Sequence, residues 1–276
     1  MTSWEDRRDG FLALVRKRPA VMGILNVTPD SFSDGGQFDS HSAAVEQAQR
    51  MVAEGSDILD IGGESTRPGS KFVPEGEEVS RVMPIMRNLA GRLSIPISID
   101  TYKAAVARQA VEAGAVVIND VWGLQRDEAM AETVAETGAA VVIMHNREAA
   151  DPDRDVMDDM RHFLDHSLEL AVKAGVPQGR IMVDPGIGFG KTADQSLTCL
   201  NRLDELADWY GLPVLLGLSR KRFIGHVLNV EVDERLVGTL AANMIGLSRG
   251  ARVIRVHDVA EHAQAVKMFT ATEDAS

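Results

Sequence analysis

Eight short apolar runs, separated by segments with helical spacing of their apolar residues, limit the folds open to this chain. Apolar runs without polar alternation are typical of strands buried on both faces, as in a parallel sheet covered by helices. Strand and helix in alternation imply right-handed crossovers. Eight such units predict an α/β fold, a closed (β/α)8 TIM barrel. The residues that follow the runs are Asn26, Gly62, Asp100, Asn119, His145, Asp184, Ser219 and His257.

The length of 276 residues fits one barrel, since such barrels occupy roughly 200 to 400 residues as a single domain. Hydrophobic residues make up 45% of the chain, which is enough for a large core without disulfides or metals. We therefore expect one domain over residues 1–276. It would consist of an N-terminal arm (1–18), the barrel (20–269) and a frayed tail (270–276).

Charge and composition exclude several classes of protein. The net charge of −12 opposes a general affinity for nucleic acid or anionic membranes. Residues 1–18 mix acids and bases and lack the apolar core of a signal peptide. No apolar stretch approaches the ~18 residues of a membrane span. Cys199, the single cysteine, cannot form an internal disulfide. We expect a cytoplasmic protein.

Polar residues at the strand ends predict a binding pocket. In a barrel all strand ends converge on one face. Asn26, Asp100, Asn119, Asp184 and His257 would therefore surround one site. For any one of them, capping of the next helix is an alternative explanation, so the prediction depends on the whole set.

Two glycine-rich loops follow the second and sixth runs. GGESTRPGS (residues 62–70) places Arg67 in a loop where glycines allow close backbone approach, although an ordinary turn has the same composition. IMVDPGIGFGKT (residues 181–192) fails the P-loop template at Pro185 and the dinucleotide template at Lys191. It leaves a tight turn that presents Phe189 beside Asp184, either as a pocket wall or as packing beneath the loop.

Cations gather near the last two runs. Ser219 is followed by Arg220, Lys221 and Arg222, which are either pocket cations or a solvated charge run. Arg255 and His257 are two positions apart, so both point to one side of a strand, as an anion clamp requires.

A pair of histidines in a predicted helix needs separate treatment. The helix covers residues 155–174, and His162 and His166 lie on one face of it at i, i+4. The segment lacks the glutamate that zinc-protease motifs place directly after the first histidine. We therefore interpret the pair as solvated surface.

The chain resembles the bacterial dihydropteroate synthase family over about residues 22–268. The motifs, in the family's order, are GILNVTPDSFSDGG, DIGGESTRPGS, PISIDTYK, INDVWG, VDPGIGFGKT, GLSRKRFIG and GTLAANMIGLSRGARVIRVHDV. The resemblance implies a transferase of folate biosynthesis. It joins 4-aminobenzoate to 6-hydroxymethyl-7,8-dihydropterin pyrophosphate, giving 7,8-dihydropteroate and pyrophosphate.

The resemblance also implies how the pterin is held. Asp184 accepts two donors from the pterin edge, and Asn119 and Asp100 complete the recognition of that edge. Lys221 approaches the pterin carbonyl and ring nitrogen. Arg255 lies against the ring and reaches toward phosphate.

The leaving group and the metal follow from the same resemblance. Asn26 is implied to bind a Mg²⁺ ion that meets the pyrophosphate. Further donors to the pyrophosphate would be Thr66, Arg67, Arg255 and His257. Asp34 and Asp100 are our candidates for stabilising the developing cation at the methylene group. The catalytic residues are therefore expected to be Asp34, Arg67, Asp100, Lys221 and Arg255.

For 4-aminobenzoate, the resemblance implies a ring against Phe189 and near Lys221. Its carboxylate would lie near Ser219 and Arg222, and its neutral amine attacks without a strong base. The first two loops should close over the bound substrates. Sulfonamides, which mimic aminobenzoate, are expected inhibitors, and the family is homodimeric.

Three other functions stay open. A methyltetrahydrofolate-dependent methyltransferase would share the Asp and Asn recognition without needing pyrophosphate. A lysine-based aldolase would need a desolvated Lys221. An inactive pterin-binding paralogue would bind substrate without turnover. Residues 145–158 match no family role, and we expect Met144 and His145 to be pocket wall only.

Overall fold

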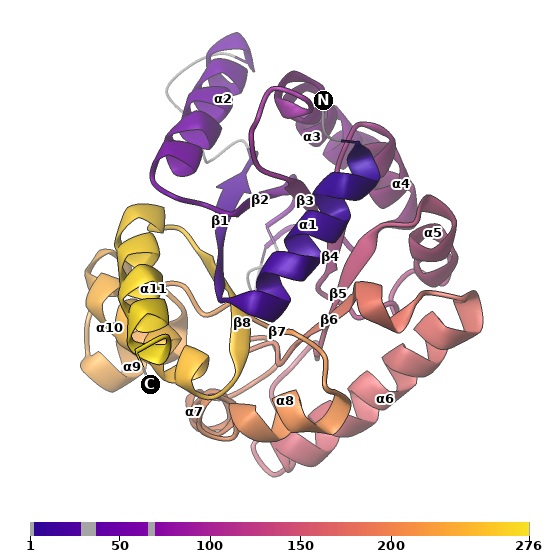
Figure 1. Ribbon diagram of the computed structural model, residues 1–276. Helices are drawn as coiled ribbons and strands as arrows, with labels where there is room; N and C mark the ends of the chain where they lie inside the picture. The colour runs from indigo at the N-terminus through magenta and orange to yellow at the C-terminus, as the bar shows by residue number, and fades with distance from the viewer. Residues whose placement is uncertain (1–2, 29–36, 66–69, 276) are drawn as a thin grey trace.

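Eight parallel strands close into a barrel with each strand next to its sequence neighbours and β8 pairing with β1 (Figure 1). This computed structural model describes residues 3–28, 37–65 and 70–275, with the backbone alone at 37–40. The strands are β1 Ala20–Asn26, β2 Ile58–Gly62, β3 Ile97–Asp100, β4 Val117–Asp120, β5 Ala140–Met144, β6 Ile181–Asp184, β7 Val214–Leu216 and β8 Ala251–Val256. The predicted TIM barrel is confirmed.

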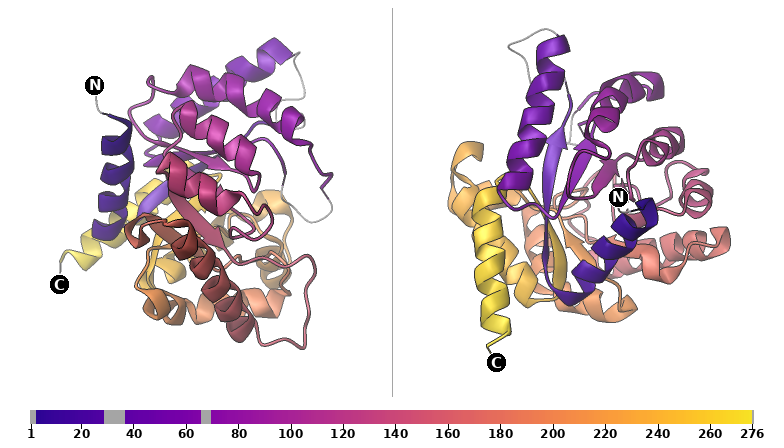
Figure 2. Two further views of the ribbon diagram at one scale, coloured as in Figure 1. Left: turned by 90° about the vertical axis from the view of Figure 1, so that its right-hand side faces the viewer. Right: turned by 45° about the horizontal axis from the view of Figure 1, so that its top comes forward.

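Helices surround the strands, as both views of Figure 2 show. They are α1 Trp4–Lys17, α2 Gln37–Ala53, α3 Glu75–Leu89, α4 Ala104–Glu112, α5 Met130–Thr137, α6 Val156–Ala174, α7 Ala193–Asn201, α8 Leu203–Tyr210, α9 Arg222–Leu228, α10 Leu236–Ser248 and α11 Val259–Glu273, with 3-10 turns η2 Gln178–Arg180 and η3 Val232–Glu234. In the described part of the chain, no helix is long and apolar enough to cross a membrane.

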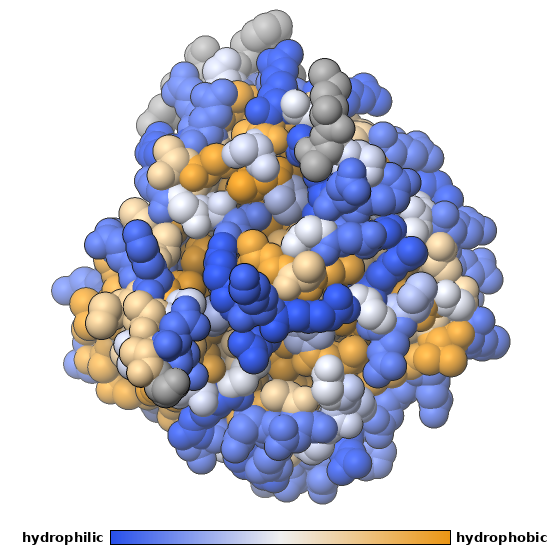
Figure 3. Space-filling view, in the orientation of Figure 1, coloured by the Kyte–Doolittle hydropathy of each residue, from blue (hydrophilic) through white to orange (hydrophobic). Residues whose placement is uncertain are grey.

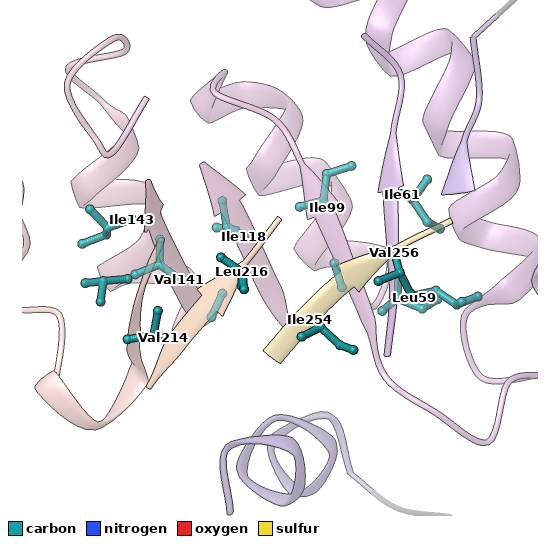
Figure 4. Packing of buried hydrophobic residues seen from close by; sticks show 14 of the residues in the cluster. Leu59, Ile61, Ile99, Ile118, Val141, Ile143, Val214, Leu216, Ile254 and Val256 are labelled. Atoms are coloured by element: carbon teal, nitrogen blue, oxygen red, sulfur yellow. The ribbon is translucent and has the colours of Figure 1, made fainter. Parts of the chain in front are cut away.

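Side chains alternate along each strand between two environments. One set, which includes Leu59, Ile99 and Ile254, packs outward against the helices and forms the larger apolar core (Figure 4). The other set points into the barrel, because successive strand residues face opposite sides. On β2, Ile58 belongs to the apolar lower interior and Asp60, two residues later, to the polar mouth. The same alternation brings Asp100, Asn119 and Asp184 into the mouth.

The N-terminal segment differs from the expected arm, since residues 4–17 form α1. Ser3 and Asp6 make a capping box at its start. Phe11, Leu12 and Val15 are buried against inward residues of the lower barrel. Figure 1 shows α1 lying across the barrel opening, and Figure 3 shows its hydrophilic outer face over an apolar surround. The helix therefore closes the end opposite the strand carboxyl ends.

The expected frayed tail is also largely helical. α11 continues to Glu273, and the backbone N–H of Asp274 still donates to the carbonyl oxygen of Thr270 at 3.0 Å. Small polar residues at the end of a chain were therefore an insufficient signal of fraying.

Candidate active site

The centre of the barrel mouth is a buried cluster of two carboxylates, one guanidinium and one amide. Arg255 of β8 donates from Nε to Asp60 Oδ2 and from Nη2 to Asp100 Oδ2, both at 2.6 Å. Asn119 Nδ2 donates to Asp60 Oδ2 at 3.0 Å. Asp100 and Asn119, predicted from strand ends, are thus brought together with Arg255, which was predicted from its spacing with His257. Asp60 was missed.

Two acceptors of this cluster have no partner. Asp60 Oδ1 and Asp100 Oδ1 are buried and accept no hydrogen bond from any residue that the structure describes. Leaving a buried acceptor unpaired is costly, which makes such atoms natural contacts for a ligand's N–H donors. Burial raises the pKa of Asp100 to about 7, against the effect of Arg255 and together with that of Asp60. The barrel mouth therefore has unpaired hydrogen-bond acceptors that a ligand's N–H groups could satisfy.

Asp184 closes β6 beside this cluster. Its Oδ1 accepts the backbone N–H of Gly186 at 2.7 Å. Burial raises its pKa, and Lys221 is the foremost group opposing that effect. Lys221, from the β7–α9 loop, donates to the carbonyl oxygen of Ile187 and lies 4.3 Å from the ring centre of Phe189. The Lys221 ammonium thus lies over the ring of Phe189.

Lys221 is strongly affected by its surroundings. Burial lowers its pKa to about 7, although Asp184 favours the charged form. A bound hydrogen-bond acceptor or anion would stabilise the charged form of this lysine.

The three consecutive cations expected at the pocket face have different surroundings. Arg220 instead pairs with Asp258, and the side chain of Arg222 is exposed at the start of α9.

Ser219 and His257 form a second contact at the mouth. Ser219 Oγ lies 2.9 Å from His257 Nδ1 and accepts the backbone N–H of His257 at 3.2 Å. Arg255 is already engaged by two carboxylates, and His257 follows the end of β8. Asn26 ends β1 opposite Gly62 of β2.

Asp34, Thr66 and Arg67 lie outside the described residues, so the structure does not place them. The two ends of the second loop are described and are tied together by Glu64. Its Oε1 accepts the backbone N–H of Val73 at 3.0 Å and the hydroxyl of Tyr102 at 3.2 Å. Its Oε2 accepts from Lys103 at 2.5 Å, and Lys103 also binds Glu78 at 2.5 Å. Sequence reasoning missed this buried ion cluster.

A pocket of about 250 Å³ opens beside Phe189 over the loops that follow β2 to β6. Its walls include Tyr102, Trp122, Arg126 and Arg147, with the Arg126 guanidinium 4.6 Å from the Trp122 ring centre. Phe189 thus lines this pocket and also contacts Lys221 at the barrel mouth. Among the described residues, no group of three or more His, Cys, Asp or Glu side chains is arranged to hold a metal ion.

Fold and site together define a (β/α)8 barrel whose mouth offers buried hydrogen-bond acceptors to a ligand's N–H donors. Comparison with known proteins agrees with this class. Residues 22–257 match the family model described as pterin binding enzyme. The chain belongs to this family, among the dihydropteroate synthases.

Similar proteins cover nearly the whole chain. The dihydropteroate synthase of Bacillus subtilis is 49% identical over 259 residues, which are 93% of this chain and 89% of the relative. A solved dihydropteroate synthase from Clostridium difficile, in the presence of pteroic acid, has a TM-score of 0.90 and 49% identity, covering 93% of this chain and 97% of the other.

Two further solved structures contain small aromatic ligands. The Xanthomonas albilineans enzyme with 4-aminobenzoic acid has a TM-score of 0.89 and 44% identity, covering 93% of each chain. The Yersinia pestis enzyme in a sulfonamide drug complex has a TM-score of 0.87 and 43% identity, covering 94% of this chain and 95% of the other.

Proposed function

We infer that this protein is a dihydropteroate synthase, which condenses 6-hydroxymethyl-7,8-dihydropterin pyrophosphate with 4-aminobenzoate to 7,8-dihydropteroate and pyrophosphate. The observation that carries this inference is the acceptor-rich barrel mouth formed by Asp60, Asp100, Asn119 and Asp184, in a chain 49% identical to a dihydropteroate synthase. The pterin edge carries ring N–H and amino donors that match such a mouth.

The deciding experiment is pyrophosphate release from the purified protein, given the pterin pyrophosphate and Mg²⁺, with and without 4-aminobenzoate. Release that requires aminobenzoate and yields dihydropteroate establishes the activity. Tight pterin binding by calorimetry without release would instead support an inactive paralogue or the methyltransferase class.

We propose that Asp184 accepts two donors of the pterin edge while Asn119 and Asp100 bind the rest of it. In support, Asp184 Oδ2 is not used by the turn that engages Oδ1, and it lies near the backbone of Gly217. Lys221, whose ammonium is buried beside Asp184, would donate to the pterin carbonyl and ring nitrogen. Binding of an acceptor there would raise the pKa of Lys221 and stabilise its charged form.

The pyrophosphate would lie toward β1 and β8. Asn26 offers one amide oxygen, and Mg²⁺ commonly takes only one or two protein ligands besides substrate phosphates and water. A single oxygen donor at this position therefore fits a Mg²⁺ ion that arrives with the pyrophosphate. When bound, the ion would neutralise charge on the leaving group. Thr66, Arg67, Arg255 and His257 are proposed as further donors to the same group.

The reaction breaks the bond between the methylene carbon and the pyrophosphate oxygen, and it forms a bond from that carbon to the amine nitrogen of aminobenzoate. Positive charge develops on the methylene group as pyrophosphate departs. Asp100 is proposed to stabilise that charge from the barrel mouth, and Asp34 from the first loop. The amine is neutral and attacks directly, losing its proton afterwards, so the residues at the mouth chiefly bind and orient.

4-Aminobenzoate is proposed to lie against Phe189 beside Lys221, with its carboxylate near Ser219 and Arg222. The Lys221 ammonium, 4.3 Å from the ring centre of Phe189, supports this placement, as does the exposed side chain of Arg222 at the start of α9. Sulfonamides, which share this shape and charge, are proposed as competitive inhibitors.

We also propose a homodimer formed through the last helices. Exposed apolar side chains are concentrated there: Val227, Leu228, Val232, Val237 and Ile245 on α9, η3 and α10. Large exposed apolar patches are typical of protein interfaces. The buried free thiol of Cys199 agrees with a cytoplasmic location.

A further inference from the structure

Lys191, which follows the turn of residues 185–190, has all three donors of its ammonium engaged. Its Nζ lies 2.7 Å from His145 Nδ1, 2.9 Å from the carbonyl oxygen of Gly186 and 3.2 Å from the carbonyl oxygen of Phe189. An ammonium has three donors and no acceptor capacity. Lys191 therefore joins the two ends of the turn to the imidazole of His145.

The partner of Lys191 fixes the tautomer of His145. Because Nδ1 accepts from the ammonium, the ring proton is on Nε2, which donates to Asp159 Oδ2 at 3.1 Å. Asp159 is held as an ionised acceptor by Arg147, at 2.9 and 3.0 Å, and by Arg154 at 2.7 Å. Burial lowers the pKa of His145 to about 3, and Lys191 adds to this effect. The ring is therefore neutral at any working pH.

The backbone of the turn lies directly on the strand end that carries His145. Gly186 has a φ of 62°, and a Cβ there would lie 1.8 Å from the carbonyl oxygen of His145. A Cβ on Gly190 would lie 2.4 Å from Arg147. Close approach of two backbones requires glycine at such positions. The turn cannot move closer to His145 and Arg147, and the hydrogen bonds from Lys191 keep it from moving away.

The other side of the same turn faces the candidate active site. Lys221 donates to the carbonyl oxygen of Ile187, and a Cβ on Gly188 would meet the Lys221 side chain at 3.0 Å. Gly186 also supplies the N–H that orients Asp184. Two lysines thus donate to neighbouring carbonyl groups of one turn: Lys191 to that of Gly186 and Lys221, on the side of the site, to that of Ile187.

We propose that Lys191 and His145 are positioning residues of the synthase reaction, which act through the 185–190 turn to set the places of Phe189, Lys221 and the Asp184 carboxylate. Each residue contacts site residues only through their backbone: the His145 N–H donates to the carbonyl oxygen of Asp184 at 3.0 Å, and Lys191 donates to that of Phe189. The proposal rests on the synthase activity proposed above, and it gives residues 145–159 a function that their sequence does not reveal.

The test compares Lys191→Met with Lys173→Met, which changes an exposed lysine on α6 in the same way. Loss of hydrogen bonds from a charged group should raise the KM for 4-aminobenzoate about tenfold, with a kcat reduced less than about threefold. Lys173→Met should match the wild type. A purely structural lysine would lower the active fraction and the Tm and leave KM unchanged, which would overturn the proposal.

A second pair of variants tests the imidazole. His145→Gln keeps an acceptor toward Lys191 and a donor toward Asp159, whereas His145→Leu keeps neither. The glutamine variant should retain a KM within about threefold of the wild type, and the leucine variant should resemble Lys191→Met. Equal KM values in the two variants would contradict the tautomer assignment. Absence of aminobenzoate-dependent turnover in the wild type would instead refute the proposed function.

Discussion

Asp60 and Arg255 are 195 positions apart in the chain and meet at 2.6 Å in the centre of the barrel mouth. The carboxylate is fully buried, and it shares its guanidinium partner with Asp100. Two carboxylates and one guanidinium leave this cluster with a surplus of negative charge, which a ligand's donors can relieve. The pair therefore orients both Arg255 and Asn119 for binding.

Asp60→Asn should change the pH dependence of activity more than stability. Asp100 still pairs with Arg255 in this variant, so the loss of unfolding free energy should stay near 1 kcal/mol. The negative charge of Asp60 is one of the groups that raise the pKa of Asp100, so its removal should lower that pKa. The acid limb of kcat/KM should move to lower pH. Asp57→Asn, which alters an ion-paired aspartate beside Arg18, serves as the matched control.

The activity should be confined to a narrow pH range around 7. Burial raises the pKa of Asp100 to about 7, so its ionised form is gained as pH rises through that value. Burial lowers the pKa of Lys221 to about 7, so its charged form is lost over the same range. A profile of kcat/KM against pH, which reports groups of the free enzyme, should be bell-shaped. Asp100→Asn should remove the acid limb and Lys221→Met the basic limb; unchanged limbs would exclude these assignments.

Asp184→Asn should weaken pterin binding by about 2 to 3 kcal/mol, because it removes the charge that accepts two donors. Titration calorimetry with 6-hydroxymethyl-7,8-dihydropterin measures this directly, without pyrophosphate. The amide can still accept the N–H of Gly186, so the turn should remain in place. An unaltered pterin affinity would remove Asp184 from the recognition of the ring.

Lys103→Met should destabilise the fold by about 3 to 5 kcal/mol, since it leaves Glu64 and Glu78 buried without their cation. Denaturant unfolding gives the value. Lys71→Met changes an exposed lysine of the loop between β2 and α3, which contains Glu64, and should be neutral. Glu64 also ties the two ends of that loop through Val73, so Lys103→Met should raise the KM for the pterin pyrophosphate. A loss of stability with unchanged KM would limit Lys103 to a structural role.

Much of the fold and part of the site were predictable from sequence. Strand ends are marked by a change from apolar to polar residues, and parallel strands bring those ends together, which is why Asp100, Asn119 and Asp184 were found. Asp60 was missed because it stands inside an apolar run. A polar residue there indicates a site only if its side chain points into the barrel, and that direction is known only once the strand is placed.

Contacts between distant segments account for the rest. His145 and Lys191 are 46 positions apart, and neither has a local pattern that indicates the other. α1 did have a local signal, since Ser3 and Asp6 fit a capping box and Phe11 and Val15 share one helical face. No sequence signal indicated where α1 packs, because a helix that closes a barrel has the same sequence pattern as any other amphipathic helix.

The position of α1 has a consequence for folding of the chain. Phe11, Leu12 and Val15 precede every barrel strand in the sequence, yet the apolar surface that they cover includes Met182, Leu215 and Val253. That surface is complete only after β8 has joined β1. The apolar face of α1 therefore stays uncovered until these long-range pairings form, and such exposed apolar surface makes a partly folded chain prone to aggregation.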